Sequence, residues 1–366
     1  MMNTPLDFDE ILSWLRECDP ARLAQLFGDA DAARAANVGP AVHLRALVEI
    51  SNRCVRQCGY CGLRAGNADL PRYRMSHDEI IACAHQATAL GYGTIVLQAG
   101  EDPTITTEWL AAIVRQIKAD TPLAVTLSLG ERTTEELSAW RAAGADRYLL
   151  RFETSDAELF ALIHPPHPGR PHQRVDRIAI LRQLRELGYE VGSGIMLGIP
   201  GQTYASVARD LLLFRQLDLD MIGIGPYIPH PATPLATGEW RRPIPAREQV
   251  PAEELMVYKA VALTRLVCPQ ANIPATTALA TINRVDGREL GLQRGANVFM
   301  PNLTPAPYRA LYQIYPNKAC ISETGAACNG CLRSRISAIG RTVGIGPGGR
   351  RKVPAAPSTT VARSQA

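Results

Sequence analysis

The stretch His43-Leu-Arg-Ala-Leu-Val-Glu-Ile50 is the first of several short apolar runs that alternate with amphipathic stretches of helical length. Short apolar runs predict buried strands, and strands that alternate with helices predict βαβ units around a parallel sheet. We assign strands to residues 43–50, 94–98, 123–129, 147–151, 189–197, 221–224, 271–273 and 296–299. Eight such units favour an α/β fold with a closed (βα)8 barrel of the TIM type over an open doubly wound sheet.

The chain divides into four parts around this barrel. Residues 1–42 are predicted to form helices packed outside the barrel, and residues 43–303 form the barrel itself. Residues 304–340 make a C-terminal segment that carries a second group of cysteines. Residues 341–366 combine several glycines with a closing stretch rich in Ala, Pro, Ser and Thr, which is typical of a flexible tail.

The composition excludes several classes of protein. Hydrophobic residues make up 46% and charged residues 20% of the 366 residues, so the chain can bury a full core. A net charge of +4 is too small to indicate a nucleic-acid partner. The sequence contains no run of roughly 18 apolar residues, which a membrane span would need. Its acidic start lacks the basic region of a signal peptide. We therefore expect a cytoplasmic protein, in which nine cysteines indicate metal binding or reactivity before disulfides.

Three cysteines follow the first predicted strand in the loop Cys54-Val-Arg-Gln-Cys58-Gly-Tyr-Cys61. This loop lies at the C-terminal end of the strand, where barrel enzymes carry their chemistry. Iron–sulfur clusters normally take four thiolates, so three cysteines leave one iron of a 4Fe–4S cluster open. The spacing and the aromatic Tyr60 are similar to the signature of radical S-adenosylmethionine (SAM) enzymes, in which SAM binds the open iron. A structural zinc knuckle is the alternative, but no fourth His or Cys lies close.

A second stretch agrees with this superfamily. Gln98-Ala-Gly-Glu101, at the end of the second predicted strand, resembles the Gly-Gly-Glu motif that binds the amino group of SAM. Ala99 departs from the usual glycine, which is a mild change where backbone atoms make the contact. The resemblance implies that Gly100 and Glu101 belong to the SAM site.

The sequence is similar to one family in particular, the HydE family of iron–iron (FeFe) hydrogenase maturases. The resemblance runs from about residue 43 to residue 335. The resemblance rests on several continuous stretches of sequence. Among them are Ile50-Ser-Asn-Arg-Cys54, Val96-Leu-Gln-Ala-Gly-Glu-Asp102, Leu127-Ser-Leu-Gly-Glu-Arg132, Gly144-Ala-Asp-Arg-Tyr-Leu-Leu-Arg151, Asn272-Ile-Pro-Ala-Thr-Thr277 and Gly295-Ala-Asn-Val-Phe-Met-Pro-Asn302. Biotin synthase and methylornithine synthase share the fold and the first cluster, but we do not expect these phrases in them.

The resemblance implies roles for individual residues. Cys54, Cys58 and Cys61 would hold the 4Fe–4S cluster. The further SAM contacts that it implies are Tyr60, Gln98, Ser128, Glu153 and Arg177, and the substrate contacts are Arg151, Thr276 and Thr277. Taken alone, some of these residues also suit structural roles. Arg151 and Glu153 share one face of a strand and suit an ion pair, and the two threonines suit a cap on the following turn.

The resemblance also implies an activity. The enzyme would cleave SAM to a 5′-deoxyadenosyl radical, which acts on a cysteine-bound iron carbonyl–cyanide precursor during assembly of the diiron subcluster of the H-cluster. The implied partners are other hydrogenase maturases and an electron donor such as ferredoxin or flavodoxin. Two alternatives stay open. One is a radical SAM enzyme with an organic, amino-acid-like substrate, and the other is a non-catalytic iron–sulfur scaffold or carrier.

Cys320, Cys328 and Cys331 form the second cysteine group, after the predicted barrel. Some members of the family carry an accessory iron–sulfur cluster at this spacing, so the resemblance implies a 2Fe–2S or 4Fe–4S cluster here. Zinc is a competing ligand for three cysteines.

The loop His164–His172 departs from the usual segment of the family. Its histidines suit a metal, but its prolines favour a stiff surface loop, which is what we expect.

Overall fold

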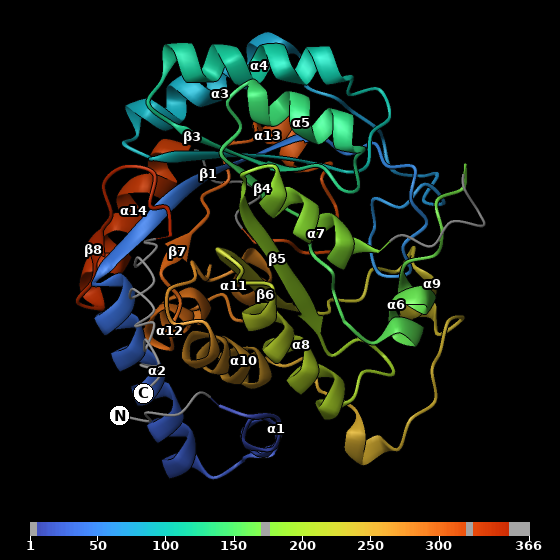
Figure 1. The fold of residues 1–366 in the computed structure, drawn as a ribbon, viewed down its shortest axis with the longest axis vertical. Coiled ribbons are helices and arrows are strands. Elements are labelled where there is room, and N and C mark those ends of the chain that lie inside the picture. The colour runs from blue at the N-terminus through green and yellow to red at the C-terminus, as the bar shows by residue number, and fades with distance from the viewer. Residues whose placement is uncertain (1–5, 170–175, 320–324, 351–366) are drawn as a thin grey trace, which may run out of the picture.

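The computed structural model describes residues 6–169, 176–319 and 325–350. Its centre is a curled sheet of parallel strands wrapped by helices (Figure 1). The strands are β1 (Ala41–Ser51), β2 (Thr94–Ala99), β3 (Ala124–Ser128), β4 (Arg147–Leu149), β5 (Glu190–Leu197), β6 (Met221–Pro226) and β7 (Val298–Phe299). They pair in the order β6-β5-β4-β3-β2-β1-β7, and every pair is parallel. The carboxyl ends of the strands therefore meet at one end of the sheet.

Residues 272–274 link the two edges of this sheet. Asn272 pairs with Met221 of β6, and Pro274 pairs with Val298 of β7, each as an isolated parallel bridge. Pro274 has no N–H to donate, which limits how far a ladder can extend there. The predicted TIM-type α/β barrel is confirmed, with the run at residues 271–273 joining the ring through bridges and not as a full strand.

Helices cover the outside of the barrel and bury apolar side chains against it. The helices between the strands are α3 (His77–Ala89), α4 (Thr107–Asp120), α5 (Thr134–Ala142), α6 (Ala157–Ile163), α7 (Arg177–Glu186), α8 (Tyr204–Gln216), α9 (Pro234–Thr237), α10 (Glu254–Val267), α11 (Thr277–Ile282) and α12 (Gly287–Gln293). Ser76, Thr133 and Thr203 start three of them with capping boxes, which satisfy N–H groups that the first turn leaves free.

The N-terminal helices α1 (Phe8–Arg16) and α2 (Pro20–Val38) lie outside the barrel, against α8 and α10 (Figure 1). Leu15 and Leu26 are fully buried. Lys259 of α10 fixes the turn between the two helices, because its ammonium group donates to the carbonyl oxygens of Leu15 at 2.9 Å and Glu17 at 2.5 Å.

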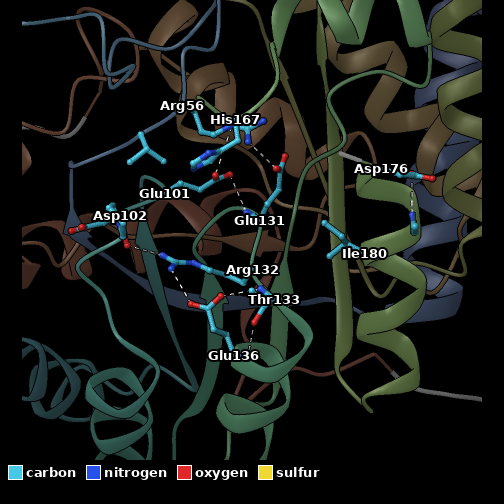
Figure 2. Close-up of a pocket in the computed structure, with 13 residues that line it drawn as sticks. Arg56, Glu101, Asp102, Glu131, Arg132, Thr133, Glu136, His167, Asp176 and Ile180 are labelled. Carbon is cyan, nitrogen blue, oxygen red and sulfur yellow. Dashed lines mark hydrogen bonds and ion pairs between the residues drawn. The ribbon is translucent and has the colours of Figure 1, made fainter. Parts of the chain in front are cut away.

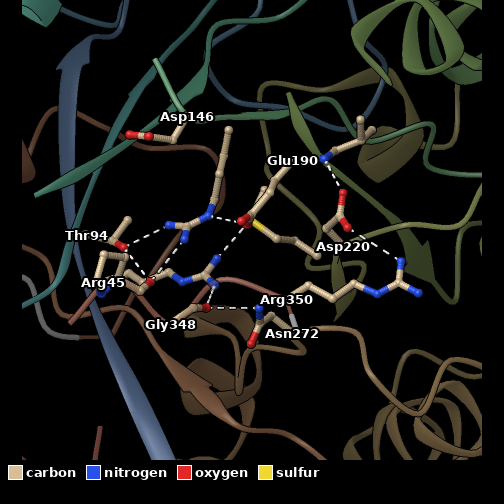
Figure 3. A network of polar contacts seen from close by, with 12 residues as sticks. Arg45, Thr94, Asp146, Glu190, Asp220, Asn272, Gly348 and Arg350 are labelled. Atoms are coloured by element: carbon tan, nitrogen blue, oxygen red, sulfur yellow. Dashed lines mark hydrogen bonds and ion pairs between the residues drawn. The ribbon is translucent and has the colours of Figure 1, made fainter. Parts of the chain in front are cut away.

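Residues 341–350 cover the amino ends of the strands. β8 (Thr342–Val343) pairs with the start of β1, and the side chains of Arg45 and Asn272 point at Gly348 in the segment that follows (Figure 3). Four barrel side chains donate to two carbonyl oxygens of this segment at 3.0 to 3.2 Å: Thr94 and Arg147 to Pro347, and Arg45 and Asn272 to Gly348. Gly93 allows the close approach, because a Cβ there would lie 1.8 Å from the carbonyl oxygen of Gly346. This part of the expected tail has fixed partners on the barrel, and residues 351–366 lie outside the described residues.

Between β7 and β8 the chain forms α13 (Ala306–Arg309) and α14 (Gly325–Ala338). The residues that follow α13 turn back toward the barrel, so that Tyr312, Tyr315 and Lys318 line its interior. In the part of the chain that the structure describes, we find no helix with the length and apolar character needed to cross a membrane.

Candidate active site

The cysteine loop follows β1 directly, and Arg72 holds it in shape. The guanidinium group of Arg72 donates four hydrogen bonds of 2.8 to 3.0 Å to backbone carbonyl oxygens, those of Asn52, Leu63, Arg64 and Asn67. Buried carbonyl groups need such partners, because water does not reach them. A single arginine therefore fixes the backbone on both sides of the three cysteines.

The loop places Cys54, Cys58 and Cys61 near one another, with Cys58 buried and the other two partly buried. Burial raises the pKa of all three thiols, to about 12 for Cys61, and the two other thiols raise the pKa of Cys58 further. Arg56 and Arg177 act in the opposite direction on Cys58, because their positive charges favour the thiolate. Among the described residues, no three His, Cys, Asp or Glu side chains converge on the position of a single metal ion. Thiolates are the ligands of iron–sulfur clusters, and three of them from one loop suit a 4Fe–4S cluster with one open iron.

A network of charged side chains lies behind the loop, on one wall of a cavity of about 520 Å³ (Figure 2). Arg56 reaches Glu131 at 3.1 Å and Glu101 at 3.7 Å. Arg177 also donates to Glu131, at 2.8 Å. Burial alone would raise the pKa of the Glu131 carboxyl, but the positive charges of Arg177 and Arg56 help to lower it to about 2. The pKa of Glu101 is raised by its burial and by the charge of Glu131. Glu131 is therefore the ionised partner of the two arginines.

His164 belongs to this network, and the prediction of a surface loop is wrong for this residue. Its side chain is 1% exposed. The ring lies between the cysteine loop and the network, with Nδ1 3.0 Å from the Sγ atom of Cys58 and Nε2 2.8 Å from Glu131. Burial and the charge of Arg177 lower the pKa of His164 to about 3, so the ring is neutral. The apolar face of α6 explains the error, because it draws the end of this helix onto the barrel.

A cavity of about 360 Å³ occupies the interior of the barrel and reaches the cysteine loop. Strands β1 to β6 all contribute side chains to its wall. Nine of the predicted site residues line it: Tyr60, Cys61, Gln98, Ser128, Arg151, Glu153, Arg177, Thr276 and Thr277. Gly100 and Glu101 lie elsewhere around the loop. Glu101 belongs to the charged network, and a Cβ on Gly100 would lie 2.3 Å from the carbonyl oxygen of Arg53.

Arg151 and Glu153 form the ion pair that their spacing allows. Arg151 Nε donates to both carboxylate oxygens of Glu153 at 3.1 Å, and Nη2 donates to one of them at 3.0 Å. Glu153 has a φ of 62°, which is unfavourable for a residue with a side chain. Asp210 of α8 supports this turn by accepting a hydrogen bond of 2.6 Å from the N–H of Ser155. Because the Arg151 side chain is still 30% exposed, the ion pair leaves it accessible from the cavity.

Thr276 has the capping role that its position also suits. Its hydroxyl group accepts from the N–H of Leu279 and donates to the carbonyl oxygen of Ile224. Thr277 begins α11, and its hydroxyl group accepts from Arg288 at 3.3 Å. Both side chains nevertheless face the cavity, so the structural role and a binding role are compatible.

The C-terminal segment brings a group into the cavity that was not predicted from the sequence. Lys318 pairs with Glu49 of β1 at 2.7 Å, and the hydroxyl group of Tyr312 accepts from Gln98 at 3.1 Å. The sequence contained one indication of the Lys318–Glu49 pair, since Glu49 is a single carboxylate within an apolar strand. A charge in such a position needs a partner, although the sequence does not say which one.

Of the second cysteine group, the structure describes one side chain. Cys331 lies on α14 and is exposed. Cys320 and the side chain of Cys328 lie outside the described residues. The accessory metal site therefore stays a prediction.

Comparisons with known proteins agree with this geometry. A family model described as the radical SAM superfamily matches residues 48–214. The FeFe hydrogenase maturase subunit HydE of Thermotoga maritima is 47% identical to this chain over 328 residues, which cover 90% of this chain and 89% of the relative. The solved structure of methylornithine synthase (PylB) has a TM-score of 0.77 at 23% identity, covering 93% of this chain and 95% of that chain. HydG, a maturase of the FeFe hydrogenase, has a TM-score of 0.74 at 19% identity, covering 92% of this chain and 72% of that chain.

The two structural similarities show the fold, and the sequence match to HydE also shows the family. This protein is a radical SAM enzyme, a class that implies a 4Fe–4S cluster and SAM. Within that class, the chain belongs to the HydE family of FeFe hydrogenase maturases. Its residues fit the cluster, because one loop offers three thiols, of which Cys58 is buried and the other two are partly buried, beside two arginines.

Proposed function

We propose that this enzyme generates a 5′-deoxyadenosyl radical from SAM and directs it at a cysteine-bound iron carbonyl–cyanide complex, during assembly of the diiron subcluster of the H-cluster. The observation that carries the proposal is that one cavity, the one of about 360 Å³ inside the barrel, contains both parts of the predicted site. Cys61 contributes to one part of its wall, and Thr276 and Thr277 contribute to another. A radical formed at the loop can thus meet a substrate within the same enclosure, protected from water by the barrel wall.

The cavity wall near the loop suits SAM. When bound, a 4Fe–4S cluster on the three thiolates supplies the electron that splits SAM into methionine and the radical. The chain binds and orients SAM. Arg177 offers a buried positive charge for the SAM carboxylate. Gln98 and Ser128 stand side by side on paired strands and offer an amide and a hydroxyl group. Gly100 packs against the backbone of Arg53 in the cysteine loop, and we assign its main chain to the SAM amino group and the backbone near Tyr60 to the adenine.

The remaining wall suits a substrate that carries hydrogen-bond acceptors or negative charge. Arg151 presents a partly exposed guanidinium group, and Thr277 presents a hydroxyl group. A carboxylate or a cyanide nitrogen is a matching acceptor for these donors. The pairing with Glu153 holds the guanidinium plane in one orientation, so the site is arranged before the substrate arrives.

We extend the proposal to the second cysteine group and to the partners. Cys320, Cys328 and Cys331 hold an accessory 2Fe–2S or 4Fe–4S cluster, which the exposed Cys331 makes accessible from the surface. Ferredoxin or flavodoxin supplies electrons, and other hydrogenase maturases deliver the substrate and receive the product. The 47% identity to a HydE supports these roles. The many free cysteines suit the reducing cytoplasm, where we place the protein.

The test is the formation of 5′-deoxyadenosine by anoxically reconstituted protein with dithionite and SAM. The assay is run with and without the cysteine-bound iron carbonyl–cyanide complex, and with free cysteine as the control substrate. We expect the complex to stimulate 5′-deoxyadenosine formation strongly and free cysteine to leave it at the basal rate.

Other outcomes contradict the proposal in distinct ways. Basal cleavage that the iron complex does not stimulate, together with stimulation by an amino acid, would point to an organic substrate. A protein that holds its cluster but does not cleave SAM would be a scaffold or carrier.

A further inference from the structure

The imidazole of His164 lies in direct contact with a cluster cysteine, and nothing in the proposed function uses it. Nδ1 is 3.0 Å from the Sγ atom of Cys58, and its other contact, with Nη2 of Arg177, is longer at 3.4 Å. Nε2 is 2.6 Å from Nη2 of Arg56, 2.9 Å from Nη2 of Arg177 and 2.8 Å from a carboxylate oxygen of Glu131. All of these groups are at least nine-tenths buried, so no water competes for the ring.

The contacts at Nε2 decide which ring nitrogen carries the proton. Both arginines can only donate, so Nε2 has to accept from them. A proton on Nε2 could donate to the Glu131 carboxylate, but it would oppose the N–H groups of both guanidinium groups. Glu131 does not need that proton, because Arg56 and Arg177 already bind it at 3.1 and 2.8 Å. The geometry therefore places a proton on Nδ1, which points at the sulfur of Cys58.

The ring and the cysteine loop are also fixed to one another through the backbone. His164 ends α6, and the N–H of Gly59 donates to the carbonyl oxygen of Ile163 at 2.8 Å. Arg56 adds a hydrogen bond to the carbonyl oxygen of Pro165 at 3.3 Å. The Phe160 ring packs against the imidazole with the centroids 5.1 Å apart. The loop and the end of the helix thus form one unit, and the ring keeps its place beside the sulfur.

We propose that His164 is a positioning residue for the SAM cluster, whose Nδ1–H donates a hydrogen bond to the Cys58 thiolate and raises the reduction potential of the cluster. The inference rests on the proposed cluster at Cys54, Cys58 and Cys61. Reduction adds negative charge to the iron–sulfur core and its thiolates. A donor at a ligand sulfur stabilises that added charge, and hydrogen bonds to sulfur are among the factors that set cluster potentials.

Two replacements separate the donor from the volume of the ring. In His164→Asn, the amide nitrogen can occupy the position of Nδ1 and donate to the sulfur. In His164→Gln, the amide lies near the position of Nε2, and no donor faces Cys58. His230→Gln is the matched control, because His230 is a buried histidine that packs on the same loop at Gly62, and its Nδ1 accepts from the N–H of Ala232.

The measurement is a redox titration of the reconstituted full-length protein, followed by electron paramagnetic resonance. The cluster in question is the one whose signal changes when SAM is added. We expect His164→Gln to lower its midpoint potential, which makes the reduction equilibrium constant smaller by roughly tenfold, the value of about one charge-assisted hydrogen bond. His164→Asn should recover most of the shift, and His230→Gln should show none.

Several results would overturn the inference. They are an unchanged potential in His164→Gln, equal shifts in the Asn and Gln variants, an equal shift in His230→Gln, or failure of both His164 variants to take up a cluster that the control takes up. A wild-type protein without any SAM-sensitive signal would instead refute the proposed function itself. The two failures are therefore distinguishable.

Discussion

Lys318 and Glu49 form a 2.7 Å ion pair in which the side chains are only 4% and 2% exposed. Glu49 lies on β1, at the start of the barrel, whereas Lys318 lies in the segment that follows the barrel. Asn302 donates a second hydrogen bond to the carboxylate, and the ammonium group also donates to the carbonyl oxygen of Tyr312. This pair ties the C-terminal segment to the wall of the cavity.

Removing one partner of this pair should destabilise the fold. Lys318→Met leaves a buried carboxylate without its counter-charge, and such changes typically cost about 3 kcal/mol. We expect the free energy of unfolding in urea to fall by that order. The double variant Glu49→Gln with Lys318→Met should recover much of the loss, because no buried charge remains. Equal stability of the single variant and the wild type would show that the pair contributes nothing.

Arg72 should be required for cluster uptake. Lysine at this position keeps the charge but cannot reach four carbonyl groups in one plane, so the backbone around the cysteines loosens. We expect Arg72→Lys to bind several-fold less iron on reconstitution while its far-ultraviolet circular dichroism is unchanged. Arg74→Lys is the control, because Arg74 is an exposed arginine of the same loop that contacts Thr104. Full iron uptake by Arg72→Lys would contradict this role.

Asp210 should make the stability of the protein depend on pH. Burial raises the pKa of Asp210 to about 7, well above that of an aspartate in the unfolded chain. Its contribution to stability is therefore fully present at low pH and is lost as pH rises through the folded-state value. Each pKa unit corresponds to about 1.4 kcal/mol. We expect wild-type stability to fall by about 3 kcal/mol relative to Asp210→Asn between pH 5 and pH 8.

Urea unfolding of the cluster-free protein at several pH values measures this effect. Asparagine can still accept from the N–H of Ser155, so the comparison isolates the charge. Parallel pH profiles of the two proteins would show that Asp210 ionises normally in the fold.

Each of Cys54, Cys58 and Cys61 should be indispensable for the reaction. Two thiolates cannot hold a cluster that normally takes four ligands, three from this loop and one from SAM. Alanine at any of the three positions should abolish 5′-deoxyadenosine formation. Cys83→Ala is the matched control, because Cys83 is buried in the core away from the loop. Turnover by any of the three variants would refute the ligand assignment.

The second cysteine group should be dispensable by comparison. Joint replacement of Cys320, Cys328 and Cys331 by alanine should lower the bound iron and sulfide and leave most of the SAM cleavage. Metal analysis alongside the activity assay tests both parts, and it also separates iron from zinc. Complete loss of cleavage would show that this site is more than accessory.

Periodicity predicted most of the fold because it depends on local sequence. The apolar runs that became β1 to β6 lie close to their expected positions, since each buries its own side chains. The run at residues 271–273 was harder to assess. Its apolar residues are buried as expected, but Pro274 removes a donor and leaves it with bridges alone.

The contacts that complete the site depend on segments far apart in the sequence. His164 lies 106 positions from Cys58, and Lys318 lies 269 positions from Glu49. No local pattern reports such a meeting. The prolines after His164 indicated a surface loop, whereas the apolar face of α6 before it decided that the ring is buried.

The segment that closes the amino end of the barrel acts as the floor of its interior. Arg45, Thr94, Arg147 and Asn272 tie this floor to the barrel through the carbonyl oxygens of Pro347 and Gly348. The cavity of about 360 Å³ lies above it and reaches the cysteine loop at Tyr60 and Cys61. We therefore expect small molecules to approach the cavity from the carboxyl ends of the strands, on the side of the cysteine loop.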